Sequence, residues 1–134
     1  MKTILAGVFV AAGLLLAAGP TLAHHAFSAE FDANKPVNLT GTVTKVEWTN
    51  PHAWFYLDVA DATGKVTNWA FELGGPNGLI RAGWTRNSMK VGDIVTVEGS
   101  RAKDGSPIAN TQVVTLKSTG QRLFAASSRG AKEP

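Results

Sequence analysis

The sequence contains no cysteine and only three histidines, two methionines and one tyrosine among its 134 residues. Without cysteine the chain can form neither a disulfide nor a thiolate metal site, and it offers no thiol for catalysis or lipid attachment. The glycine-rich stretch GGPNG at residues 74–78 is not followed by Lys-Ser or Lys-Thr, so it is not a phosphate-binding loop. No Ser-His-Asp spacing is present either. The sequence therefore favours a binding protein over an enzyme.

The first 23 residues have the pattern of an export signal. Lys2 precedes an apolar run from Ile4 to Ala18, and Thr21-Leu22-Ala23 places small residues at the −3 and −1 positions of a cleavage site. The apolar run is shorter than the ~20 residues that span a bilayer, so we expect no retained membrane anchor. We expect cleavage after Ala23, a periplasmic or secreted location, and a mature chain of 111 residues that starts at His24.

The positive charge of the chain is concentrated at its C-terminal end. Residues 24–116 hold eight basic and nine acidic side chains, whereas residues 117–134 hold four basic and one acidic. The body therefore lacks the basic surface of a nucleic-acid-binding protein. Residues 118–134 are rich in Ser, Ala and Gly and predict a disordered tail. Such a tail is also compatible with an interaction module that meets an envelope partner or an anionic surface.

The body of the chain predicts five strands and one short helix. Pro76 and Asn77 can open a helix over residues 79–82, and Gly83 can close it. In the first strand the apolar positions change phase after residue 43, which predicts a β-bulge or strong coiling of the strand. Three strands, a helix and two strands are the order of a small all-β, OB-like Greek-key barrel at 37–117, after an N-terminal segment at 24–36. The predicted strands span residues 37–48, 53–61, 66–73, 94–102 and 108–116.

Several stretches resemble a family of small exported bacterial proteins of unknown function. They are HHAFS at 24–28, GTVTKVEWTNPHAWFYLDV at 41–59, a W-x-F-E sequence at 69–72 and KVGDIVTVEGSRAKDG at 90–105. The resemblance covers nearly all of the mature chain, and it implies no particular activity. The strand order and the V-G-D-x-V-x-V-x-G stretch are also similar to periplasmic bacterial OB-fold proteins, a similarity of fold that confers no function.

The placement of the histidines suggests a metal site. Cleavage would make His24 the N-terminus, whose amine and ring nitrogen can chelate one ion, and His52 could add a third nitrogen. This arrangement is a histidine brace, and a planar set of nitrogen ligands favours Cu(II). His25 offers an alternative mode through the terminal amine, its own amide and its ring. With so few sulfur ligands, a Cu(I) carrier would be hard to build.

Two acidic residues near the new N-terminus are candidates for supporting such a site. Glu30 and Asp32 could bind the metal or hold a ligating ring by a hydrogen bond, or they could simply be solvated. Asp58 and Asp61 flank a predicted turn and are interpreted as turn residues. The hypothesis is therefore copper handling or sequestration rather than turnover.

The main alternative is a metal-free OB module that binds a ligand or an envelope partner on an aromatic strand face. Trp54 and Tyr56 share one face of their strand with Asp58, whereas Phe55 and Leu57 belong to the apolar face. Stacking on exposed aromatic rings suits sugars or bases. Trp48 and Trp69 are interpreted as packing residues, because tryptophan fills small barrels well.

Overall fold

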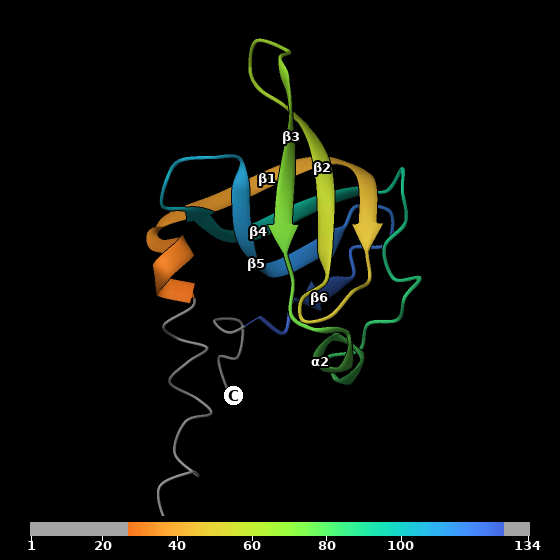
Figure 1. The fold of residues 1–134 in the computed structure, drawn as a ribbon. Coiled ribbons are helices and arrows are strands. Elements are labelled where there is room, and N and C mark those ends of the chain that lie inside the picture. The colour runs from red at the N-terminus through yellow and green to blue at the C-terminus, as the bar shows by residue number, and fades with distance from the viewer. Residues whose placement is uncertain (1–26, 128–134) are drawn as a thin grey trace, which may run out of the picture.

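Six strands form one sheet in the computed structural model, which describes residues 27–127 (Figure 1). A helical turn at residues 27–30 precedes the first strand. The prediction of an all-β protein is confirmed. In chain order the elements are β1 (Phe31–Glu47), β2 (Trp54–Ala60), β3 (Val66–Glu72), α2 (Pro76–Arg81), β4 (Ile94–Ala102), β5 (Ile108–Leu116) and β6 (Arg122–Phe124).

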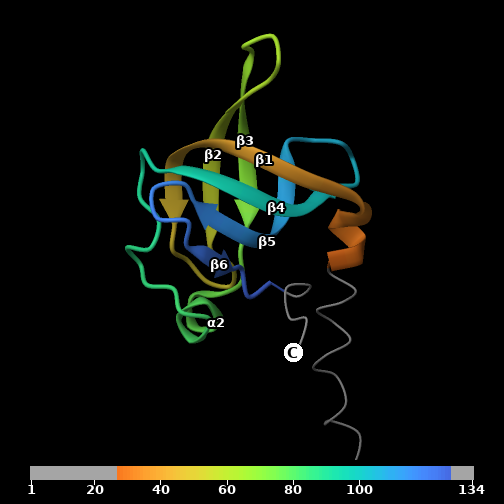
Figure 2. The ribbon, with the colours of Figure 1, turned by 180° about the vertical axis from the view of Figure 1, so that it is seen from behind.

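The strand order in the sheet is β3-β2-β1-β4-β5-β6, and these neighbours are antiparallel. β3 makes a second, parallel pairing with β5, in which residues 70–72 lie opposite residues 108–110. The sheet is strongly curled, with the β2–β3 turn at one end and α2 at the other (Figures 1 and 2). The double pairing of β3 brings segments from the middle and the end of the chain together.

The long strand β1 contains the predicted bulge. Its register against β2 shifts between Val43 and Lys45, where the apolar phase of the sequence changes. Val43 is buried, whereas the residues on either side of it are not. Gly41 lies close against β2, because a Cβ at this position would overlap the backbone carbonyl of Asp58. The bulge lets one strand pair with β4 through its first half and with β2 through its second.

The predicted hairpin of β2 and β3 is present, and its turn is built around Asp61. Asp61 Oδ1 accepts hydrogen bonds from Thr63 N (2.8 Å), Thr63 Oγ1 (2.6 Å) and Lys65 N (3.0 Å). Gly64 adopts the left-handed conformation that the turn requires, with a φ of 84°. Asp58, in contrast, lies in β2 and accepts a hydrogen bond from Asn68 Nδ2 (2.9 Å).

The hydrophobic core lies inside the curled sheet. Phe55 and Leu57 of β2 point inward, as their alternation predicts, and Phe55 stacks on Phe71 of β3 with ring centroids 5.0 Å apart. Burying aromatic and aliphatic side chains of this size supplies most of the driving force for folding. Trp48 and Trp69 pack against the core from positions of partial burial, in agreement with their interpretation as packing residues.

The structure differs from the prediction at both ends of the body. β1 begins at Phe31, which is buried, so the second half of the predicted N-terminal segment 24–36 belongs to the sheet. Residues 118–127, which the composition placed in a disordered tail, include the strand β6 (Arg122–Phe124), and Leu123 and Ala125 are buried. Three strand residues among polar neighbours give too short an apolar pattern for recognition.

Candidate functional site

The half-exposed ring of His52 lies in the loop between β1 and β2, beside the end of β3. Ala53 N donates a hydrogen bond to Gly74 O (3.0 Å), which ties the loop to the chain that follows β3. Gly75 has no room for a side chain, since a Cβ there would lie 2.8 Å from the Pro51 carbonyl oxygen. These contacts fix the loop and leave 49% of the His52 side chain exposed.

Glu72, the last residue of β3, places a carboxylate next to this ring. His52 Nδ1 lies 3.3 Å from Glu72 Oε1, and Glu72 is only 9% exposed. Burial raises the pKa of the Glu72 carboxyl above its ordinary value, and the neighbouring Glu30 raises it further. The proximity of His52 acts in the opposite direction. A buried acid with a shifted pKa and a titratable neighbour is typical of functional sites.

A buried polar cluster from the end of the chain lies behind Glu72. Asn110 of β5 is the cross-strand neighbour of Glu72 in the parallel pairing. Ser127 Oγ lies 3.2 Å from Asn110 Oδ1 and donates a hydrogen bond to Thr111 O (2.8 Å). Asn110 Nδ2 is buried and makes no hydrogen bond of normal geometry within residues 27–127, although its amide lowers the pKa of Glu72 slightly.

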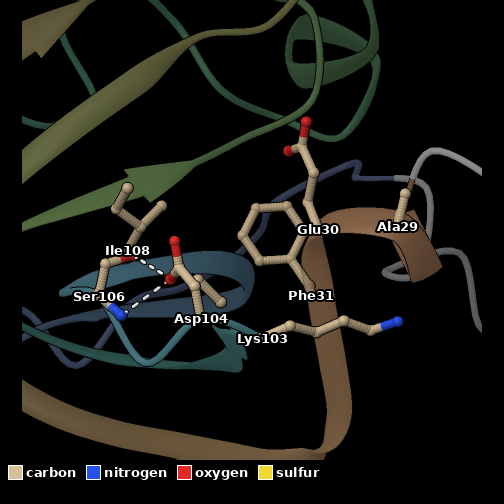
Figure 3. A pocket seen from close by; sticks show the side chains of 8 residues that line it. Ala29, Glu30, Phe31, Lys103, Asp104, Ser106 and Ile108 are labelled. Atoms are coloured by element: carbon tan, nitrogen blue, oxygen red, sulfur yellow. Dashed lines mark hydrogen bonds between the residues drawn. The ribbon is translucent and has the colours of Figure 1, made fainter.

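Glu30 connects the N-terminal turn to this site. Its carboxylate points away from Lys103 and toward the chain that follows β3 (Figure 3). The backbone of Glu30 is anchored, because Lys103 N donates to Glu30 O (2.9 Å). Glu30 also lines a pocket of about 320 Å³ between the turn at residues 27–30 and the β4–β5 connection. Phe31, Asp104 and Ile108 are among the other residues that line this pocket.

The predicted metal ligands are divided between described and undescribed parts of the chain. His24 and His25 lie outside the described residues, whereas His52 lies at the site. Within residues 27–127, no group of three or more His, Cys, Asp and Glu side chains is assembled to hold a metal ion. Of the predicted supporting residues, Glu30 faces the site, but Asp32 Oδ1 accepts a hydrogen bond from Asn34 N (2.9 Å). Asp32 thus makes a local hydrogen bond within β1.

Sequence reasoning missed Glu72, Asn110 and Ser127. A usable signal was present for Glu72, because a lone acid stands between Phe71 and Leu73 in an otherwise apolar end of the strand. A charged residue flanked by fully buried neighbours calls for a partner. Glu72 lies next to His52 only because β2 pairs with β3, and it lies next to Asn110 only because β3 pairs in parallel with β5.

The face of β1 and β2 that carries the aromatic residues of the alternative hypothesis also carries charged side chains, and these contact one another. Tyr56 OH donates a hydrogen bond to Glu47 Oε2 (3.2 Å), and Lys45 Nζ lies 2.6 Å from Glu47 Oε1. The same ammonium group lies 5.5 Å from the centre of the Tyr56 ring. Partial burial and the contact with Glu47 raise the pKa of Tyr56 above its usual value. Trp54, which pairs with Glu47, is partly exposed beside them.

Replacing Glu72 by glutamine should change how the stability of the protein depends on pH. Because the folded-state pKa of Glu72 is raised, the folded protein binds this proton more tightly than the unfolded chain does. The free energy of unfolding therefore falls as the pH rises from about 4.5 through the folded-state pKa. E72Q should remove this fall and raise Tm at pH 7 by a few degrees, on the order of 3 °C.

This prediction is checked by thermal unfolding of both proteins from pH 4 to pH 8. The difference in Tm between E72Q and the wild type should be small at the acidic end and grow with pH. E98Q, which removes the β4 carboxylate that lies 3.5 Å from Arg122 Nη2, is the control for the loss of one negative charge. A difference for E72Q that shrinks as the pH rises would contradict the raised pKa.

Fold and site together define a small all-β protein in which a half-exposed histidine lies against a buried carboxylate. The chain belongs to a family of unknown function, DUF6152, whose model matches residues 11–111. This agrees with the resemblance found in the sequence. No curated protein matches the chain. Among the helices of the described region, none has the length and apolar character needed to cross a membrane.

Proposed function

We propose that this is an exported protein that binds Cu(II) through a histidine brace, for copper handling or sequestration. The observation that carries the proposal is the position of His52, a half-exposed ring beside Glu72 at the part of the molecule that Glu30 faces. His24 lies three residues before the helical turn at residues 27–30, and three residues of extended chain span at most ~10 Å. The proposal requires that the His24 amine cover the remaining distance from this turn to His52.

In the proposed site the His24 amine and ring would supply two nitrogens and the His52 ring a third. His25 would replace the His24 ring in the alternative mode. Nitrogen donors in a plane suit Cu(II), and each must be deprotonated to bind, so acidification should release the metal. The site requires a free amine at His24, which in turn requires cleavage after Ala23 and export to the periplasm or beyond.

The OB-like Greek-key barrel is part of the same proposal. Its support is the second pairing of β3, which joins β5 and so links the two sides of the strand order. The short helix α2 between β3 and β4 has the place that this fold gives it. In such a barrel the loop that holds His52 and the chain after β3 share one rim, as their hydrogen bonds require.

A competitive Cu(II) titration tests the proposed function. The protein is prepared with an N-terminus verified as His24 by mass spectrometry, beside a form that carries an extra N-terminal Gly-Ser. We expect one tight site per chain, weakened more than about 100-fold by the extension, because loss of a direct ligand should exceed the 10–100-fold cost of losing a supporting contact. H52A should weaken binding comparably. Equal and weak binding by all three forms would refute the copper site.

A metal-free ligand module on the aromatic face is the second candidate. The observation in its favour is the connected set of Lys45, Glu47 and Tyr56, whose mutual contacts hold donors, acceptors and a ring in place beside Trp54. If copper binding fails, a screen of soluble glycans read by tryptophan fluorescence tests this face. Binding that W54A and Y56F both reduce would support it.

A further inference from the structure

Glu72 stands out because the burial of a carboxylate is costly. Among the described residues it is the one charged side chain that is buried. Removing a carboxylate from water is unfavourable unless it is paired, and its raised pKa reflects that cost. The neighbouring positions Phe71 and Leu73 are filled by apolar side chains of the core.

The surroundings of Glu72 direct it toward His52. Three groups act on this carboxylate: the His52 ring, the Glu30 carboxylate and the Asn110 amide. Glu30 repels it, so the attractive partners are His52 on one side and Asn110 on the other. Ser127 lies against Asn110 Oδ1, which leaves Nδ2 as the free donor of this buried amide. His52 Nδ1 is the ring atom at 3.3 Å from Glu72 Oε1.

We infer that Glu72 is the positioning residue of the metal site, which holds His52 with its proton on Nδ1 and presents Nε2 to the metal. This inference rests on the proposed function. A carboxylate beside one ring nitrogen favours the tautomer that carries the proton there, and it leaves the opposite nitrogen unprotonated. The half-exposed ring then offers Nε2 in a fixed direction. Glu72 itself touches no metal.

Support from Asn110 and Ser127 makes the C-terminal segment part of this arrangement. Asn110 is held by Ser127, and Ser127 is held by its hydrogen bond to the Thr111 carbonyl. Asn110 is in turn the cross-strand neighbour of Glu72 in the parallel pairing of β3 with β5. The residues that hold His52 in place therefore come from β3, from β5 and from Ser127, the last described residue of the chain.

The test joins a measurement of the ring with a measurement of metal affinity. Two-dimensional ¹H–¹⁵N spectra of the metal-free protein report which ring nitrogen of His52 is protonated. We expect Nδ1–H in the wild type and in E98Q, and a shift toward Nε2–H in E72L. Cu(II) affinity should fall roughly 10- to 100-fold in E72L, and less in E72Q, whose amide oxygen can still accept a hydrogen bond. Backbone spectra confirm that each variant is folded.

The outcomes separate this inference from the proposed function. An Nε2–H tautomer in the wild type would overturn the positioning role, even with tight copper binding. Copper affinity that H52A lowers and E72L leaves unchanged would overturn it as well, while the proposed function would stand. Weak copper binding by the wild type would overturn the proposed function and the metal role of Glu72, and the tautomer would still decide whether Glu72 orients the ring. Should E72L fail to fold, E72A, which also lacks an acceptor, decides with the same two readouts.

Discussion

Ending the chain after Lys117 should lower Tm by more than about 15 °C, whereas ending it after Ser127 should change Tm by less than about 2 °C. The first truncation removes β6 and with it Leu123, which is 3% exposed, and Ala125, which is fully buried. Loss of a buried leucine side chain alone costs about 2–5 kcal/mol.

Hydrogen bonds add to this loss. Gly74 N donates to Ala125 O (2.8 Å), and the Trp84 indole Nε1–H donates to Phe124 O (2.8 Å). Without residues 118–127 both donors lose their partners, and a buried donor left unpaired costs a further 1–3 kcal/mol or so. The measurement is thermal unfolding by circular dichroism of the two truncated chains and the full chain.

This comparison also separates the two parts of the basic C-terminal end. Only the cut after Ser127 removes the charges at Arg129 and Lys132 and keeps every described residue, so any role of the tail in meeting an envelope partner must be tested with that variant. A chain ending at Lys117 that melts within a few degrees of the full protein would show that β6 contributes little to stability.

Gly74→Ala should destabilise the protein by about 2–3 kcal/mol and lower Tm by roughly 10–15 °C. A Cβ at Gly74 would overlap the backbone carbonyl of Ala126, and its next contact would be the carbonyl oxygen of Ala125 at 3.1 Å. Both obstacles are backbone atoms, so no side-chain rotation can relieve them. The backbone at Ala125 and Ala126 would have to move away from the end of β3.

Gly78→Ala is the matched control for this prediction. It adds the same methyl group four residues later, in α2, where the nearest atom is Ala126 Cβ at an ordinary 3.6 Å. Alanine is favoured over glycine inside a helix by roughly 0.5–1 kcal/mol, so G78A should raise Tm by a few degrees. Chemical denaturation of both variants gives the two free energies. Equal effects of the two substitutions would mean that the close approach at Gly74 is not rigid.

Much of the fold could be predicted because its strands carry strong local patterns. β4 lies where the alternation of Val95 and Val97 with polar residues places it, and β5 spans the predicted range around the apolar pair Val113 and Val114. The bulge in β1 was visible as a change of apolar phase, and the helix α2 was visible from Pro76 and Gly83. β6 escaped prediction because its only buried residue, Leu123, is ordered by pairing with β5.

The site was predictable only in part, for a related reason. His52 could be singled out because histidine is scarce and because it follows Asn50-Pro51 in a loop. The partners of His52 are contributed by strands that meet only in the folded sheet. Glu72 is 20 positions away along the chain, and Asn110 is a further 38. No spacing rule on a single sequence joins them, because the parallel pairing of β3 with β5 is itself non-local.

The described chain starts and finishes at the same place in the molecule. Glu30 near its beginning acts on Glu72, and Ser127 at its end lies against Asn110, the neighbour of Glu72. An affinity tag or fluorescent protein fused directly after Ser127 would thus be attached beside the candidate site. The Asp61–Gly64 turn is exposed at the opposite end of the sheet (Figure 1). Labels, surface attachment or the new termini of a circular permutant belong there, where they leave His52 unobstructed.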